Sequence, residues 1–202
     1  MSDVKIVPTG TANIASVRAA LTRLGASVSD AGTGRDVTLA AGVVLPGVGA
    51  FGAAMTRVGD QGLASALRER IEEGRSTLVV CVGMQLLCRV SEESPGAKGL
   101  GILDATVTRF GDEVRVPQLG WNQVDPASAS RFVEPGWAYF ANSYRIDRVP
   151  DGWAGATTEY GGGFVSALER GNVLACQFHP ELSGPWGASL LGRWLETAEE
   201  AA

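Results

Sequence analysis

Apolar and polar residues alternate in two different patterns along the first half of the chain. Short, mostly apolar runs typical of buried strands lie at residues 4–7, 26–29, 42–45 and 78–80. Apolar residues recur at helical spacing over residues 14–24 and 63–71, with Asn13 as a cap and Gly25 and Gly74 as ends. This alternation predicts a doubly wound, mostly parallel central sheet with right-handed crossovers and helices on both faces.

The second half of the chain follows a different pattern. A polar, glycine-containing loop is predicted over residues 91–101, and a series of short β-rich segments follows it. These segments lie at residues 105–110, 120–124, 137–141, 155–158, 164–168 and 173–178. Residues 187–198 then read as an amphipathic closing helix. We therefore expect a single α/β domain over residues 1–202, with a β-rich C-terminal half that extends the sheet.

Composition and charge restrict the possible functions. The chain has 202 residues, of which 45% are hydrophobic, and its net charge of −5 argues against nucleic acid as a partner. No apolar run reaches the length of a membrane span, and the start of the chain lacks a signal-peptide profile. The three cysteines form no paired metal spacing, so we expect no metal site. A reducing cytoplasm is the expected location.

The apolar run at residues 78–80 ends at Cys81, and Gly83 opens a segment with a helical pattern. A strand that turns sharply into a helix exposes one side chain at the turn and directs backbone N–H groups toward whatever that side chain attacks. The pattern therefore predicts a nucleophile elbow with cysteine as the nucleophile. A buried thiol that caps a core strand is the alternative, and the elbow pattern alone does not separate the two.

His179 is the only histidine in the chain and lies just after an apolar segment. The spacing His-x-Glu lets the carboxylate of Glu181 orient the imidazole, and Pro180 stiffens the turn between them. A lone histidine is more often structural, but a nucleophilic Cys81 needs a base, and no other imidazole exists. These residues can form a Cys–His–Glu triad. Cys88 and Cys176 are interpreted as core residues.

Five motifs lie at residues 45–51, 81–87, 120–122, 156–161 and 177–181. Together they resemble class I glutamine amidotransferases, and most closely the glutaminase subunits of imidazole glycerol phosphate synthase. The Cys81 elbow and the His-x-Glu motif are shared by the whole class, whereas the other three motifs point to these glutaminase subunits. The resemblance covers nearly the whole chain.

The resemblance implies a mechanism and a set of site residues. Cys81 would attack the carboxamide of glutamine to give a γ-glutamyl thioester, and His179, oriented by Glu181, would protonate the ammonia and later activate water. No cofactor is implied. Backbone N–H groups would hold the oxyanion at Val48, Gly49 and Val82. The expected substrate-binding residues are Gln85, Asn142, Ser143 and Tyr144.

The resemblance also implies a partner. In that family the glutaminase forms a heterodimer with a (β/α)8-barrel cyclase, and ammonia passes through the barrel to a phosphoribulosyl-type substrate. The products are imidazole glycerol phosphate and an aminoimidazole carboxamide ribonucleotide. Trp121 is the best tryptophan candidate for the partner face.

Several positions depart from the family pattern. Relatives have glycine two residues before the nucleophile, where Val79 can crowd the elbow or shift its strand. Histidines of two family motifs are replaced by Gln118 and Asn142, a lysine by Leu182, and the stretch 8–13 also differs. Two alternatives therefore stay open: another class I amidotransferase or glutaminase with a different acceptor, and a partner-binding subunit with weakened catalysis.

Overall fold

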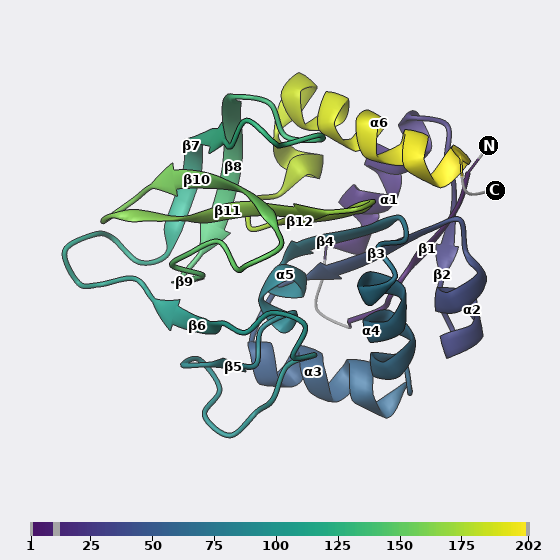
Figure 1. Ribbon diagram of the computed structural model, residues 1–202, viewed down its shortest axis with the longest axis horizontal. Helices are drawn as coiled ribbons and strands as arrows, with labels where there is room; N and C mark the ends of the chain where they lie inside the picture. Colours follow the sequence, from purple (N-terminus) through teal and green to yellow (C-terminus); the bar gives the residue numbers. More distant parts are fainter. Residues whose placement is uncertain (1, 10–12, 201–202) are drawn as a thin grey trace.

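The computed structural model describes residues 2–9 and 13–200 and contains one nine-stranded sheet, seen nearly edge-on in Figure 1. Five strands are parallel and lie in the order β2-β1-β3-β4-β12. Four of them belong to the first half of the chain, while β12 enters from the far end. The bounds are β1 (Asp3–Ile6), β2 (Ser27–Asp30), β3 (Gly42–Gly47), β4 (Thr77–Cys81) and β12 (Val173–Cys176).

Antiparallel strands continue this sheet beyond β12 in the order β11-β10-β7-β8. A separate three-stranded sheet pairs β5, β6 and β9. The predicted β-rich extension is thus confirmed. The bounds are β5 (Val90–Ser91), β6 (Thr106–Arg109), β7 (Gln118–Pro126), β8 (Gly136–Asn142), β9 (Tyr144–Arg145), β10 (Ala154–Glu159) and β11 (Gly163–Arg170).

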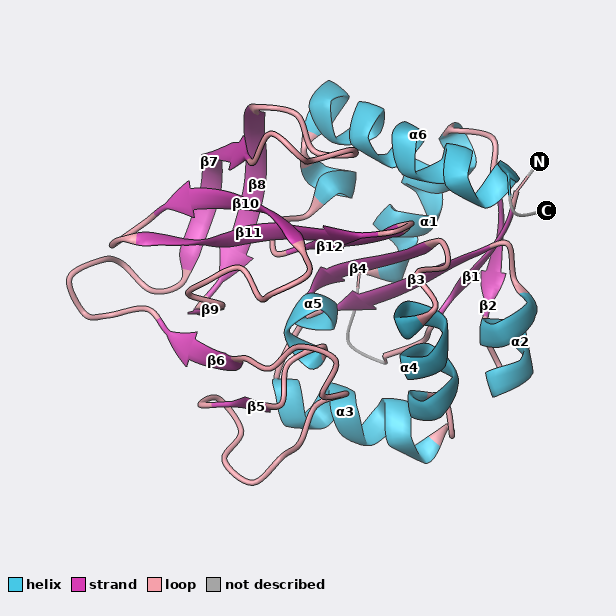
Figure 2. Ribbon diagram, in the orientation of Figure 1, coloured by secondary structure: helices cyan, strands magenta, loops and turns pink. Residues whose placement is uncertain are grey.

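Helices cover both faces of the parallel half of the sheet, as predicted (Figure 2). One face carries α1 and α6, and the other carries α3, α4 and α5, with α2 packed against α4. The central strands β3, β4 and β12 are buried along their whole length, as expected for a sheet covered on both faces. The helices are α1 (Ile14–Arg23), α2 (Gly34–Leu39), α3 (Phe51–Asp60), α4 (Ala64–Glu72), α5 (Val82–Leu86) and α6 (Gly184–Glu200).

The sequence pattern missed two helices. Helix α2 begins with a capping box, in which the Thr33 side chain accepts from Asp36 N and the Asp36 carboxylate accepts from Thr33 N. That signal was present in the sequence. Helix α3 has no side-chain cap, and small residues separate its buried positions, so its pattern is weak. Asn13 caps α1 as predicted, whereas the predicted turn after residue 7 and the stretch 8–13 include residues 10–12, outside the described part.

Arg70 is a buried cation in the core of the parallel half, 1% exposed on α4. Its guanidinium donates to the backbone oxygens of Val37, Ala40, Ala41 and Ser76 and to the Thr77 hydroxyl. Burial lowers the pKa of Arg70 to about 10. These bonds tie α4 to the ends of α2, β3 and β4, so Arg70 helps to place the elbow strand.

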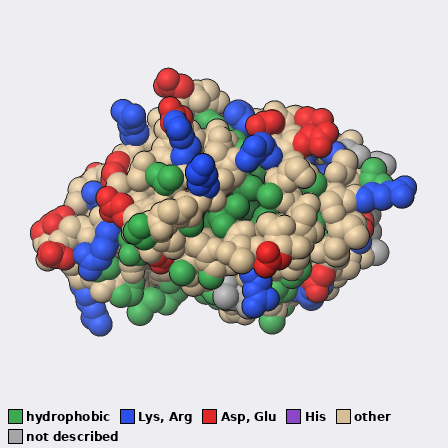
Figure 3. Space-filling model, turned by 90° about the horizontal axis from the view of Figure 1, so that it is seen from below, with side chains coloured by type: hydrophobic (Ala, Val, Ile, Leu, Met, Phe, Trp, Pro, Cys, Tyr) green, Lys and Arg blue, Asp and Glu red, His purple; other side chains and the backbone are tan. Residues whose placement is uncertain are grey.

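The surface carries charges of both signs. Figure 3 shows Lys and Arg side chains interspersed with Asp and Glu on one face, with hydrophobic side chains between them. This mixture agrees with the modest net charge of −5. Among residues 2–9 and 13–200, no helix is long and apolar enough to cross a membrane.

Candidate active site

The turn between β4 and α5 has the geometry of an elbow. Cys81 adopts a φ of 54°, the left-handed region, and is the only non-glycine residue with positive φ in the described part of the chain. The next residue begins α5. A non-glycine residue in this region is strained and persists only where the surrounding structure enforces it. The strained turn holds the thiol at the carboxyl end of the parallel strands.

Two glycines allow the elbow to form. A Cβ atom on Gly83 would lie 2.2 Å from the carbonyl oxygen of Leu45, and one on Gly47 would lie 2.7 Å from the amide nitrogen of Gly83. Both separations are too short for real atoms. Helix α5 therefore packs directly onto the backbone of β3 because both positions lack a side chain.

Val79, the departure that the sequence flagged, fits beneath the elbow. Its backbone pairs with Leu45 on β3 and Ala175 on β12, and its side chain is fully buried. Its Cγ1 atom would lie 3.2 Å from a Cβ on Gly83, so the branched side chain packs under the glycine of α5. At this position β4 pairs in continuous register with both neighbouring strands.

His179 follows β12 and is held from two sides. Its backbone nitrogen donates to Tyr139 O on β8 (2.9 Å), and its carbonyl oxygen accepts from the Ser183 hydroxyl (2.7 Å). Its Nδ1 lies 2.9 Å from Oε1 of Glu181, which belongs to the 3₁₀ helix η1 (Pro180–Leu182). The carboxylate thus binds one ring nitrogen, as the His-x-Glu spacing predicted, and the imidazole also forms a hydrogen bond with the Cys81 side chain.

The charge state of His179 follows from these contacts. Burial opposes the charged ring, but hydrogen bonds to the Cys81 thiol and the Glu181 carboxylate, with their charges, raise the pKa of His179 to about 10. Cys81 is 4% exposed and His179 is 6% exposed, so solvent screens the group weakly. The imidazolium form is therefore favoured at neutral pH, where it can stabilise a thiolate and donate a proton.

A cavity of about 230 Å³ lies in front of the thiol. It brings together every predicted site residue except Glu181, which lies behind the imidazole. Its walls come from the loop after β3, the elbow, the ends of β8 and β12, and the loop after β5. The lining residues are Val48, Gly49, Cys81, Val82, Gln85, Glu93, Ala141, Asn142, Ser143, Tyr144 and His179.

Glu93 is a lining residue that the sequence reasoning missed. It lies in the polar loop after β5, and its Oε2 accepts from the backbone nitrogen of Phe51 at 2.6 Å. That bond fixes the carboxylate at the start of α3, facing the same cavity as the thiol. A glutamate in a polar loop carries no sequence signal of this placement.

The other two cysteines belong to the core, as the sequence analysis proposed. Cys88 and Cys176 are both fully buried. Burial raises the pKa of Cys88 to about 12, and burial together with Glu169 and Glu181 raises the pKa of Cys176. Cys81 is therefore the thiol that faces the cavity.

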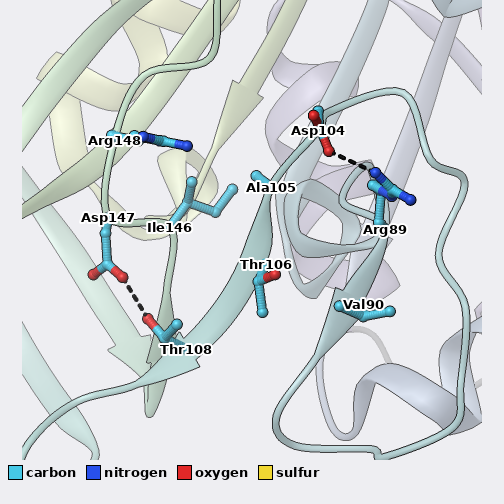
Figure 4. A pocket seen from close by; sticks show the side chains of 9 residues that line it. All are labelled: Arg89, Val90, Asp104, Ala105, Thr106, Thr108, Ile146, Asp147 and Arg148. Carbon is cyan, nitrogen blue, oxygen red and sulfur yellow. Dashed lines mark hydrogen bonds and ion pairs between the residues drawn. The ribbon is translucent and has the colours of Figure 1, made fainter.

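A larger depression of about 550 Å³ lies between β5, β6 and residues 146–148 (Figure 4). Its charged groups are largely paired, with Arg89 bound to Asp104 (2.9 Å) and Thr108 bound to Asp147 (2.9 Å). No thiol or imidazole lines it. Within the described residues, no group of three His, Cys, Asp or Glu side chains could hold a metal ion. The thiol and imidazole that can react both line the smaller cavity at Cys81.

Comparison with protein families and curated proteins gives a consistent result. The family model described as glutamine amidotransferase class-I matches residues 13–197. The chain is 40% identical over 198 residues to the imidazole glycerol phosphate synthase subunit HisH of Symbiobacterium thermophilum, covering 96% of this chain and 93% of that protein. It is 39% identical over 205 residues to the imidazole glycerol phosphate synthase subunit HisH of Moorella thermoacetica, covering 100% of this chain and 98% of that protein. The chain is 41% identical over 202 residues to the chloroplastic imidazole glycerol phosphate synthase hisHF of Arabidopsis thaliana; the match covers 96% of this chain and 34% of that protein.

Solved structures share the fold at lower identity. A crystal structure of a glutamine amidotransferase superposes with a TM-score of 0.77 at 22% identity, covering 97% of this chain and 98% of the other. PurLQS from Thermotoga maritima has a TM-score of 0.69 at 16% identity and 99% coverage of both chains. At these identities the likeness concerns the fold alone.

Proposed function

Because the chain belongs to the class-I glutamine amidotransferase family, we propose that it is the glutaminase subunit of an imidazole glycerol phosphate synthase. One observation carries the proposal: Cys81, His179 and Glu181 form a connected triad at the wall of a cavity of about 230 Å³. The curated relatives at 39–41% identity are subunits or parts of that synthase, which favours this acceptor over another one. The family resemblance seen in the motifs is thereby confirmed.

The triad supports nucleophilic release of ammonia. The Cys81 thiolate attacks the side-chain carboxamide carbon of glutamine, forming a C–S bond and a tetrahedral oxyanion. The protonated His179 gives its proton to the departing nitrogen as the C–N bond breaks, leaving a γ-glutamyl thioester. Neutral His179 then takes a proton from water as the water oxygen attacks the thioester carbon, and the C–S bond breaks, which releases glutamate and restores the Cys81 thiolate beside protonated His179. Glu181 holds the imidazole in place throughout.

The cavity walls support binding of the whole substrate. The backbone N–H groups of Val82, at the start of α5, and of the Val48–Gly49 loop are assigned to the oxyanion. Residues Asn142, Ser143 and Tyr144 are assigned to the α-amino and α-carboxylate groups, and Gln85 contacts the bound glutamine. Glu93 is the only carboxylate on the cavity wall, so we assign it to the α-ammonium group.

An exposed apolar face next to the cavity supports a protein partner. Four large apolar side chains are exposed there: Leu119 (66%) and Trp121 (54%) on β7, Trp137 (57%) on β8 and Leu182 (41%) on η1. Leu119 and Trp121 pair across the strands with Ala141 and Tyr139, so this docking face reaches the cavity wall at Ala141. Large exposed apolar side chains typically mark interaction sites. We assign the face to the barrel-shaped cyclase.

The remaining assignments follow from the same proposal. The chain acts as one glutamine amidotransferase domain over residues 1–202 in a cytoplasmic heterodimer with the cyclase. It requires no metal or cofactor for glutamine hydrolysis. At Leu182, which departs from the lysine of the family pattern that the sequence resembles, the cyclase is expected to present an apolar surface.

The test is a glutaminase assay of the chain alone and in complex with the cyclase from the same source. Glutamate formation should depend on Cys81 and should rise when the cyclase binds. The complex should also convert the cyclase substrate with glutamine as the nitrogen source. A complex that forms but releases no glutamate would contradict the proposal and favour a weakened partner-binding subunit. Hydrolysis without cyclisation would favour a different acceptor.

A further inference from the structure

Gln177 is a buried side chain in direct contact with the nucleophile, and the triad mechanism gives it no role. It is fully buried, two residues before His179. Its Nε2 atom lies 3.7 Å from Sγ of Cys81, within hydrogen-bonding range for sulfur. Its Oε1 accepts from Nε2 of Gln85 at 3.0 Å. Because Oε1 is occupied by that donor, the amide orientation is fixed and an N–H group faces the sulfur.

The backbone also aims Gln177 at Cys81. Its nitrogen donates to Ser166 O on β11 (2.8 Å), while the nitrogen of His179 donates to Tyr139 O on β8 (2.9 Å). Residues 177 and 178 form a bend directly after β12, and these two backbone bonds hold the bend on both sides. Gln177 and His179 therefore reach the thiol from one anchored segment, and each offers it a donor.

A series of amide hydrogen bonds supports Gln177 in turn. Nε2 of Gln85 binds both Gln177 Oε1 and the carbonyl oxygen of Tyr144, the latter at 3.3 Å. The same Tyr144 oxygen accepts from Nδ2 of Asn142 at 3.1 Å. The sulfur is thus linked through Gln177 and Gln85 to the substrate-binding segment at the end of β8. These bonds also commit both donor hydrogens of the Gln85 amide, which leaves its Oε1 for the substrate.

We propose that Gln177 is a positioning residue that donates a hydrogen bond to the Cys81 thiolate and holds it in the attacking orientation. A nearly buried thiolate has little water to solvate it, so it needs donors from the protein. His179 gives up its proton during the reaction and then no longer donates. Gln177 keeps its N–H throughout, so the thiolate restored after each turnover meets one permanent donor. This inference rests on the proposed function only in naming glutamine as the substrate.

The experiment uses alkylation of Cys81 by iodoacetamide across a pH series, with the full chain. Alkylation reports this thiol, since Cys88 and Cys176 are fully buried, and the Cys81→Ala variant supplies the blank. In Gln177→Met, which keeps the length but lacks the N–H, the pH midpoint of alkylation should rise by about 0.5 to 1 unit. In the complex, kcat for glutamine should fall about 10-fold with KM changed by less than about twofold.

Gln177→Glu serves as the second variant. It matches the size of glutamine and replaces the N–H with an acceptor, so the alkylation midpoint should rise further. If Gln177→Met does not fold, the alkylation midpoint of Gln177→Glu alone tests whether Gln177 donates to the Cys81 thiolate. Thr197→Val is the control for losing a buried hydrogen-bonding side chain. Thr197 lies on α6 and is 1% exposed, and its hydroxyl forms hydrogen bonds with the Ser76 hydroxyl and with the carbonyl oxygen of Trp194. Its alkylation midpoint and kcat should match the wild type.

An unchanged alkylation midpoint in folded Gln177 variants would overturn the positioning role. So would a fall in kcat of the same size in Thr197→Val, since it would show a general packing effect. Alkylation requires no glutamine. A shifted midpoint in a protein that hydrolyses no glutamine would uphold the role of Gln177 while refuting the proposed function, so the two failures are distinguishable.

Discussion

The charge of His179 provides the sharpest test of the site, because it is the only histidine in the chain. An NMR titration of imidazole signals therefore reports this residue without assignment ambiguity. Hydrogen bonds to Cys81 and Glu181 outweigh burial and raise its pKa from the ordinary 6.5 to about 10. The perturbation is Glu181→Gln, which keeps the shape of the side chain and removes its charge.

The size of the change follows from the contact at 2.9 Å between Nδ1 and Oε1. A hydrogen bond to a charged group contributes about 1.5–3 kcal/mol, and a change of one in pKa corresponds to about 1.4 kcal/mol. Glu181→Gln should therefore lower the pKa of His179 by about one to two. The alkaline limb of the glutaminase pH profile should move down by a similar amount, since less His179 remains protonated to serve the departing ammonia.

The same shift has a defined effect on stability. A histidine whose folded pKa lies above 6.5 stabilises the fold fully below pH 6.5, and this contribution is lost as pH rises through about 10. In Glu181→Gln the loss should begin at the same pH, near 6.5, end at a lower pH than in the wild type, and be smaller in total. Urea unfolding at pH 6 and pH 9.5 measures it.

Two controls complete the titration. Cys81→Ala should also lower the pKa of His179, because the thiol is its other raising partner. Glu93→Gln removes a carboxylate from the same cavity that has no bond to His179, so it should leave the titration midpoint unchanged. A wild-type midpoint near 6.5, or equal midpoints in wild type and Glu181→Gln, would refute the described triad.

Four further substitutions test the site and its scaffold. Cys81→Ala should abolish glutamine hydrolysis in the complex while the circular dichroism spectrum and cyclase binding stay unchanged; residual wild-type activity would exclude this thiol as nucleophile. Gly83→Ala should cost about 1–3 kcal/mol in urea unfolding and most of the activity, because its Cβ would lie 2.2 Å from Leu45 O. Val79→Gly should lower stability by about 2–4 kcal/mol, since it removes a fully buried side chain, and a faster enzyme of equal stability would instead show that the valine strains the elbow. Arg70→Met should cost about 3–5 kcal/mol by leaving its acceptors without a donor, with wild-type stability contradicting the structural role.

The sequence by itself determined the elements whose signals are local. Apolar runs identified four of the five parallel strands, whereas the run that forms β12 was assigned to the β-rich extension. Asn13 and the glycines gave the ends of α1 and α4. The strand, cysteine and glycine at residues 78–83 fixed the elbow, because a sharp strand-to-helix turn depends on neighbouring residues. The pairing of His179 with Glu181 could also be predicted from the sequence, since the two residues of this hydrogen bond are only two positions apart.

Only the tertiary structure decided which distant residues meet. Strand β12 comes from the far end of the chain and pairs with β4, and this pairing brings His179 to Cys81. Glu93 and Gln177 gain their places through contacts with Phe51 and Cys81 that no local pattern encodes. The surroundings of Val79 are likewise tertiary, since its side chain packs beside Gly83 at the start of α5. The sequence specified the reactive groups, and long-range strand pairing determined what surrounds them.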